Sequence, residues 1–206
     1  MPVINVGRWG KYRIKTNKRL FLYPEEWLKM VKLLNTKQKM TFELLLHTGA
    51  RHNEVKHIKV SDIDFDRYTI NLRITKVRSK ERETRPTPRL ITTTREFAKK
   101  LEKYLKKFNL GKDDYFPVLS NAETNRVLKD RLKKIGRNDW KDFSPHNIRK
   151  TTETWLLACG GDGFLISTRL GHSPETARKH YISPNVFKKS EITLIKKILY
   201  NLHERL

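Results

Sequence analysis

Three short segments of the chain hold the residue types that could do chemistry. The first runs from Thr48 to Glu54 and places Arg51 just after Gly49, a residue that can end a helix in left-handed geometry. The backbone at this point can present Arg51 to a cleft while Glu54 reaches back to hold it. An ordinary corner between two helices with a surface arginine would have the same sequence, so this segment decides nothing by itself.

The second segment begins with a Ser-Pro pair at Ser144 and places His146 and Arg149 three residues apart. Ser-Pro is a favourable helix start, and the spacing puts both side chains on one face near the positive helix N-terminus, where a phosphate is favoured. The third segment is a Leu-Gly-His triplet that ends in His172, with Tyr181 nine residues further on. Taken singly, a satisfied histidine and a packing tyrosine explain these residues equally well.

One reaction would use all these side chains together, the cutting of a phosphodiester bond. Without a metal, side chains must supply a nucleophile, positive donors on the non-bridging oxygens, and an acid that protonates the leaving alkoxide. Arginine suits the second task because its planar fork matches phosphate and stays charged at any working pH. The chain contains many arginines, so their positions matter more than their number.

The charge of the chain points to a polyanionic partner. Its 206 residues contain 45 Lys and Arg against 22 Asp and Glu, a net charge of +23, which exceeds what solubility requires. Nucleic acid is favoured over a membrane, because the sequence lacks an apolar stretch of bilayer length and a signal-peptide core at its start.

A lone cysteine, Cys159, excludes a disulfide within the chain and a thiolate-rich zinc site. We expect one main domain that is intracellular and uses no metal or cofactor.

Part of this charge has an ordinary explanation. In the expected helix 95–108 the apolar residues fall on one stripe, which leaves lysines 99, 100, 103, 106 and 107 on the outer face. These lysines would contribute only to the affinity for a polyanion.

The expected elements make an α+β fold that is mainly helical with a small antiparallel sheet. A strand over 68–75 and a return arm over 85–91 flank a basic hairpin, and Pro86 and Pro88 limit the return arm to an edge or a short strand. A basic tail, 1–19, comes first, and an amphipathic helix, 190–205, comes last. The expected helices are 24–35, one ending at 48, 53–58, 95–108, 122–135, 145–159, 163–170, 174–180 and 190–205.

Together the three segments resemble the catalytic domain of the tyrosine recombinase or phage integrase family. Its motifs are T-G-x-R-x-x-E, a β-hairpin lysine, H-x-x-R, and L-G-H with a tyrosine nine residues beyond the histidine; here they appear in the same order, from Thr48 to Tyr181. The resemblance extends over about 20–206. Asp62, ahead of the strand, and Thr151, just after the second arginine, fit the family pattern too.

The resemblance implies a role for each of these residues. Arg51 and Arg149 would bind the non-bridging oxygens of the scissile phosphate, with His146 and His172 as proton carrier and hydrogen-bond donor. Tyr181 would attack phosphorus, giving a 3′-phosphotyrosyl enzyme and a free 5′-hydroxyl. Lys76 would protonate the leaving oxygen, with Lys80 as the rival because its spacing to Pro88 also fits.

The resemblance also implies partners and an origin. Double-stranded DNA would be the substrate, and dimers to tetramers would form on it, since the last helix of family members often docks into a neighbouring protomer; packing against its own domain is the alternative. We expect a cytoplasmic, nucleoid-associated protein encoded by a virus or other mobile element of a prokaryotic host. Family members usually have a core-binding domain ahead of the catalytic domain, whereas only about 20 residues precede the match. The chain is therefore either a catalytic fragment or a minimal enzyme with a basic tail.

Three other functions remain possible at this point. A type IB topoisomerase has similar catalytic residues, but the size of the chain and the spacing from the L-G-H triplet to the tyrosine favour a recombinase. A decayed integrase that only binds DNA would have the same charge, yet all the expected polar residues are present. A basic ribonucleoprotein component would explain the charge but not the spacing.

Overall fold

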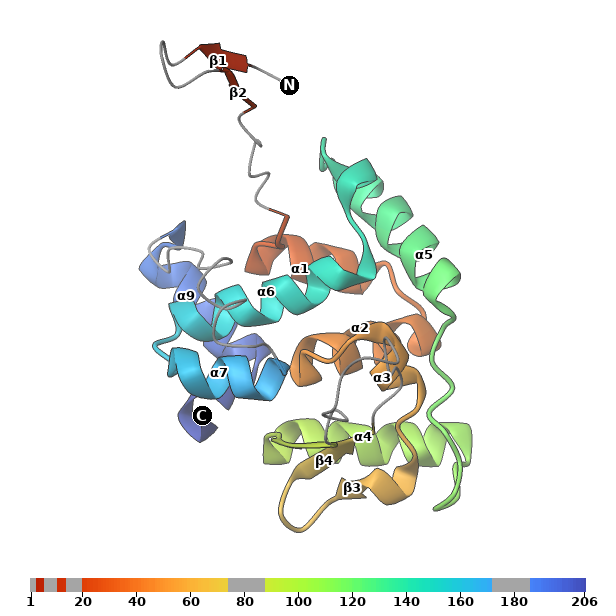
Figure 1. Cartoon of the computed structure of the whole chain (residues 1–206). Helices are drawn as coiled ribbons and strands as arrows, with labels where there is room; N and C mark the ends of the chain where they lie inside the picture. Colours follow the sequence, from red (N-terminus) through yellow and green to blue (C-terminus); the bar gives the residue numbers. More distant parts are fainter. Residues whose placement is uncertain (1–2, 6–10, 14–19, 74–87, 172–185) are drawn as a thin grey trace, which may run out of the picture.

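The computed structural model describes residues 3–5, 11–13, 20–73, 88–171 and 186–206. This part of the chain is mainly helical, with a three-stranded antiparallel sheet and a separate two-stranded hairpin, as the sequence predicts for the fold class (Figure 1). The α-helices are α1 (Pro24–Lys32), α2 (Thr36–Thr48), α3 (His52–Lys56), α4 (Arg95–Phe108), α5 (Asn121–Lys134), α6 (Pro145–Ala158), α7 (Gly163–Leu170) and α9 (Lys189–Ile198). The strands are β1 (Val3–Asn5), β2 (Lys11–Arg13), β3 (Ile63–Asp64), β4 (Thr69–Leu72) and β5 (Arg89–Thr92), and the 3-10 helices are η2 (Val60–Asp62), η3 (Trp140–Asp142) and η5 (Leu202–Arg205).

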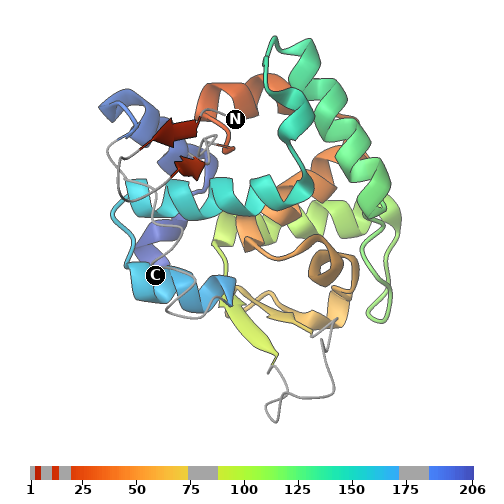
Figure 2. The same ribbon diagram turned by 45° about the horizontal axis from the view of Figure 1, so that its top comes forward.

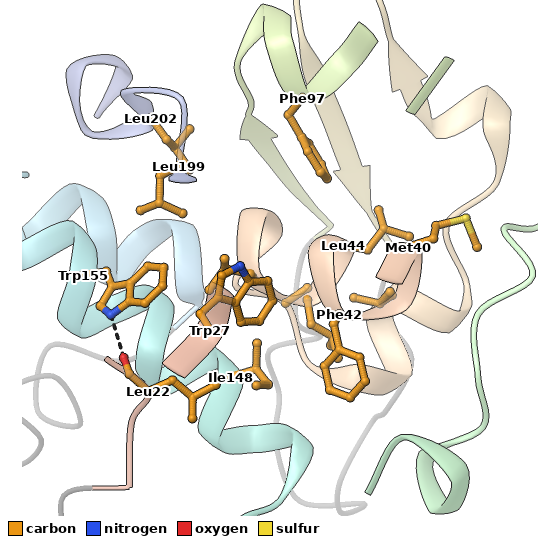
Figure 3. Packing of buried hydrophobic residues seen from close by; sticks show 14 of the residues in the cluster. Leu22, Trp27, Met40, Phe42, Leu44, Phe97, Ile148, Trp155, Leu199 and Leu202 are labelled. Atoms are coloured by element: carbon orange, nitrogen blue, oxygen red, sulfur yellow. Dashed lines mark hydrogen bonds between the residues drawn. The ribbon is translucent and has the colours of Figure 1, made fainter. Parts of the chain in front are cut away.

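Helix α6 crosses the centre of the molecule and contacts helices on both sides (Figures 1 and 2). Trp155 packs edge-on against Trp27 of α1, with 6.3 Å between ring centroids. The Trp155 indole N–H donates to the carbonyl of Leu22 at 2.8 Å, as Figure 3 shows. On the other side of α6, the Thr152 hydroxyl donates to the carbonyl of Leu46 in α2 at 2.8 Å. The core is therefore built around one helix, and that helix also carries His146 and Arg149.

The three-stranded sheet has the order β3-β4-β5, and Ile70 in the middle strand pairs with Ile63 on one side and Ile91 on the other. The expected strand 68–75 is too long at its start, because Tyr68 has a φ of +56° and belongs to the preceding turn. Arg73 lies just past the strand, and its guanidinium binds the buried carboxylate of Asp62 at 2.8 Å. The end of β4 is thus tied to η2.

The first helix ends earlier than expected, at Lys32, and the reason is the cap of the next helix. The Asn35 side chain accepts a hydrogen bond from the backbone N–H of Gln38 at 3.0 Å, which starts α2 there. The expected helices 53–58, 122–135 and 145–159 differ from α3, α5 and α6 by one or two residues at their ends. The expected helix 174–180 lies outside the described residues.

The expected C-terminal helix 190–205 is wrong as a single element. It breaks after Ile198, because Tyr200 and Asn201 adopt φ values of +52° and +55°, and the chain continues as η5. Its apolar face is nevertheless partly buried within this chain, where α9 packs against α1 and α6. Ile195 and Leu202 are fully buried, and Figure 3 shows Leu202 in the same cluster as Trp155.

One of the five lysines expected on the outer face of α4 is not a surface lysine. Lys100 binds the Glu43 carboxylate at 2.6 Å, and the Tyr104 hydroxyl donates to the other oxygen of Glu43 at 2.8 Å. Glu43 is only 4% exposed, so this is a buried polar cluster between α2 and α4. The other four lysines, at 99, 103, 106 and 107, are exposed as expected.

In the part of the chain that the structure describes, every helix is too short or too polar to cross a bilayer.

Candidate active site

The corner between α2 and α3 places Arg51 at the edge of the site. Gly49 ends α2 with a φ of +63°. A Cβ at this position would lie 2.5 Å from a side-chain carbon of Leu170 and 3.3 Å from one of Thr152, so both the conformation and the close packing require glycine. The chain then turns into α3 at its N-cap, Arg51, whose side chain is 51% exposed.

The Glu54 carboxylate binds Arg51, as the motif predicts, but its main partner is another arginine. It accepts the backbone N–H of Arg51 at 2.7 Å and the Arg51 Nη1 at 3.2 Å. Arg89 of β5 donates to it through both arms of its guanidinium, Nη1 to Oε1 at 3.0 Å and Nη2 to Oε2 at 2.9 Å. Burial alone would raise the pKa of Glu54, but the hydrogen bond and charge of Arg89, followed by the Arg51 contacts, outweigh burial and lower it. Glu54 is therefore a carboxylate at neutral pH.

Arg149 connects the ends of two helices from within the core. It is only 2% exposed. Its Nη1 donates to the carbonyl of Gly49 at 2.8 Å and its Nη2 to the carbonyl of Leu170. Burial, and then the positive charge of Arg51, lower the pKa of Arg149 to about 10, so it keeps its charge at neutral pH. The charge of Arg51 thus acts on Arg149, the other arginine that the sequence singles out.

The structure brings together two of the sequence-predicted site residues, Arg51 and Arg149. His146 lies in the first turn of α6, one turn before Arg149; its side chain is exposed, whereas that of Arg149 is buried. Lys76, Lys80, His172 and Tyr181 lie outside the described residues. The chain next to them is described, however: Gly171 ends α7 just before His172, close to Arg89 and to the Leu170 carbonyl that Arg149 binds.

Sequence reasoning missed two arginines that organise the site, Arg89 and Arg169. Arg89 faces the same side of β5 as the buried Ile91, so the two-residue period of a strand could have indicated it. Arg169 is 5% exposed and donates to the carbonyls of Thr92 and His47 at 2.5 and 2.6 Å. These bonds fix α7 to β5 and α2, and no sequence pattern signals them.

Metal-binding groups are not found in the described part of the chain, where no three His, Cys, Asp or Glu side chains cluster. The donors around Gly49 are guanidinium groups, and these suit a phosphate or carboxylate oxygen rather than a cation.

Two solved structures share this fold, a recombinase and a transposon integrase. The crystal structure of XerA recombinase matches 90% of this chain and 65% of its own chain with a TM-score of 0.61 at 24% identity. The Tn1549 transposon integrase, solved in complex with transposon right end DNA, matches 90% of this chain and 68% of its own with a TM-score of 0.65 at 18% identity. These likenesses confirm the expected fold.

Sequence comparison then shows the family. Residues 20–186 match the profile of the phage integrase family, and the chain belongs to that family. It is 31% identical over 149 residues to the tyrosine recombinase XerA of Saccharolobus solfataricus, covering 70% of this chain and 46% of that protein. It is 32% identical over 166 residues to the tyrosine recombinase XerC of Staphylococcus epidermidis, covering 74% and 52%. The chain thus spans about half the length of the curated relatives that it matches.

Proposed function

We propose that this chain is the catalytic part of a site-specific recombinase that cuts and rejoins double-stranded DNA through a tyrosine. The observation that carries the proposal is the convergence at one corner of Arg51 and Arg149, two arginines that sit in family motifs. The positive charge of Arg51 lowers the pKa of Arg149, and Arg149 binds the carbonyl of Gly49. A phosphate placed there would meet two charged guanidinium groups. It would also lie beside the end of α7, which leads to His172.

The proposed reaction assigns one task to each side chain. Arg51 and Arg149 bind the non-bridging oxygens of the scissile phosphate and stabilise the charge of the transition state. The Tyr181 oxygen attacks phosphorus, and a new O–P bond forms as the bond to the 5′-oxygen breaks. Lys76, or Lys80 in its place, gives a proton to that leaving oxygen. His146 and His172 donate hydrogen bonds and carry the proton that Tyr181 releases.

Rejoining is the reverse of cleavage. A 5′-hydroxyl attacks the phosphorus of the phosphotyrosyl link. The bond from phosphorus to the Tyr181 oxygen breaks, so the DNA strand is restored and Tyr181 is released. The covalent intermediate conserves the energy of the broken bond, so the cycle uses no cofactor, and the arginines supply charge that a metal supplies in other phosphoryl-transfer sites.

Strand exchange between two DNA sites needs more than one subunit, so we propose dimers to tetramers on DNA. The basic tail 1–19 and the exposed lysines of α4 would add contacts to the phosphate backbone. An origin in a virus or other mobile element stays a prediction.

The test of this proposal is a covalent protein–DNA adduct. Wild-type protein incubated with supercoiled plasmid in excess EDTA and quenched with denaturant should give an adduct linked through Tyr181. Tyr181→Phe should give none while binding a labelled duplex with nearly unchanged affinity, because the hydroxyl is a nucleophile rather than a binding group.

Other outcomes would contradict the proposal in distinct ways. An adduct in Tyr181→Phe would mean that a different residue attacks, and activity that requires Mg²⁺ would indicate a nuclease-like mechanism. Relaxation of supercoils without exchange between two DNA molecules would favour a topoisomerase.

A further inference from the structure

Arg89 lies where three parts of the proposed active site meet. Its guanidinium binds both oxygens of Glu54, the carboxylate that also holds Arg51. It comes two residues after the segment 74–87, which contains the proposed general acid. It also lies against the backbone of Gly171, where a Cβ would be 2.5 Å from Arg89 Nη1 and 2.9 Å from its Cζ.

Three guanidinium groups, those of Arg51, Arg89 and Arg149, lie near two carboxylates. Glu54, whose side chain is 8% exposed, binds Arg51 and Arg89 directly, and the charge of Glu153 acts on Arg149. Four donors fill its two oxygens: both arms of Arg89, the Arg51 N–H and the Arg51 Nη1. The Arg51 side-chain contact is the longest of them, at 3.2 Å. Arg89 therefore makes the closer side-chain contacts to Glu54, and the Arg51 side chain stays 51% exposed.

We propose that Arg89 is a positioning residue which, by occupying both oxygens of Glu54, keeps Arg51 available to the scissile phosphate. This inference rests on the proposed function and deepens it. Without Arg89, Arg51 would be the cation left in direct contact with the buried carboxylate, among the described residues. A bidentate pair between Glu54 and Arg51 would then compete with phosphate for the same guanidinium.

The neighbourhood of Gly171 makes the placement of Arg89 specific. The guanidinium that binds Glu54 passes over an α-carbon that has no side chain, and a Cβ there would displace it. The backbone of Gly171 is also left-handed, with a φ of +64°. Both the close contact with Arg89 and this backbone conformation therefore favour glycine. The same contact places Arg89 directly beside the residue that precedes His172.

A double-mutant cycle on this pair separates positioning from simple structural support. Arg89→Gln should lower the rate of adduct formation on supercoiled plasmid by roughly 10- to 100-fold, the loss expected from a small misplacement of a phosphate-binding group, and leave the Kd for a labelled duplex nearly unchanged. Adding Glu54→Gln removes the charge that captures Arg51, while glutamine can still accept the Arg51 N–H. The double variant should therefore cleave faster than Arg89→Gln alone. If Arg89 only holds the fold together, the double variant will be as slow or slower.

Two further variants complete the experiment. Arg137→Gln is the matched control, because Arg137 is also mostly buried and binds Glu26 at 2.6 Å on α1; its adduct rate should equal that of wild type. Arg89→Lys supplies the charge without the planar fork and should keep more activity than Arg89→Gln; this variant decides the question if thermal melting shows that Arg89→Gln is unfolded.

The outcomes distinguish the two proposals. If wild-type protein forms no adduct through Tyr181, the proposed function fails and the inference fails with it. If wild type forms the adduct, but the double variant shows no rescue or a folded Arg89→Lys is as inactive as Arg89→Gln, the inference alone is overturned.

Discussion

Arg51 and Arg149 have the same proposed ligand but very different surroundings. Half of the Arg51 side chain is exposed, and its contacts are local to the start of α3. Arg149 is buried, and its two terminal nitrogens bind carbonyls at the ends of α2 and α7. One arginine is therefore a ligand presented at the surface, and the other is also a structural cross-link.

This difference predicts separable effects on stability. Arg149→Ala should lower the free energy of unfolding by about 2–4 kcal/mol, because two buried carbonyls lose a charged donor. Arg51→Ala should change it by about 1 kcal/mol or less, as expected for an exposed ion pair. Both should abolish adduct formation. Urea unfolding beside the adduct assay measures the two effects, and equal destabilisation by the two variants would contradict the assignment.

The sequence predicted Arg51 and Arg149 because each sits in a short motif with a helix end beside it. It did not predict Arg169 or the main partner of Glu54, since those contacts join distant parts of the chain. The carbonyls that Arg169 binds are 77 and 122 positions away in sequence. Which carbonyls are left without a backbone partner at helix and strand ends is decided by tertiary packing, and a local pattern does not contain that information.

At the scale of elements, α2 contains a histidine that the structure keeps neutral. His47 lies between the rings of Phe97 and Tyr200, with centroid distances of 4.0 and 5.4 Å. Burial, then the positive charges of Lys100 and Arg169, lower the pKa of His47 from 6.5 to about 3. The stack connects α2 to α4 and to the turn after α9.

The lowered pKa of His47 predicts acid sensitivity. Above pH 6.5 both the folded and the unfolded state hold a neutral His47, and its contribution to stability is constant. Between pH 6.5 and 3 the unfolded state takes up a proton that the folded state does not, so stability falls as the pH falls, by about 1.4 kcal/mol per unit at most. His47→Phe keeps the stack and should flatten this dependence. Urea unfolding from pH 6.5 to 5, above the range of most carboxylates, measures the difference, and parallel curves for the two proteins would refute the assignment.

The packing of α9 predicts that the C-terminal segment is part of the core. Ile195→Ala should lower the free energy of unfolding by about 2–5 kcal/mol, the cost of a cavity at a fully buried site. Lys197→Ala on the exposed side of the same helix is the control and should have little effect. Deleting 190–206 should lower the melting temperature sharply and reduce DNA binding and cleavage together. A truncated protein that melts like wild type but loses only cooperative assembly would show that the segment couples subunits instead.

Helix positions could be predicted from apolar periodicity, whereas the break in the last segment could not. The apolar stripe continues through Leu199 and Leu202, so periodicity predicts one long helix. Only Asn201 hints at left-handed geometry, and Tyr200, which shares it, gives no such signal. The stack of Tyr200 on His47, a tertiary contact, accompanies this turn in the backbone.

At the scale of the whole molecule, the net charge of +23 predicts how DNA affinity responds to salt. The logarithm of the association constant should fall linearly with the logarithm of salt concentration, with a slope of about −0.9 for each phosphate neutralised. Anisotropy titrations of a labelled duplex at several NaCl concentrations give the slope directly. A flat response would exclude nucleic acid as the main partner.

Helix α6 is bound directly to the chain segment that precedes α1, so a force on that segment acts on α6. Asn147 and Thr151 of α6 bind the backbone of Leu20 and Leu22 at 3.0 Å each, and Arg149 lies between them on the same helix. Tension on the chain ahead of Leu20 therefore acts first on the two turns of helix that carry the buried arginine. Such a force would reach the Arg149 guanidinium through helix α6, with no loop in between.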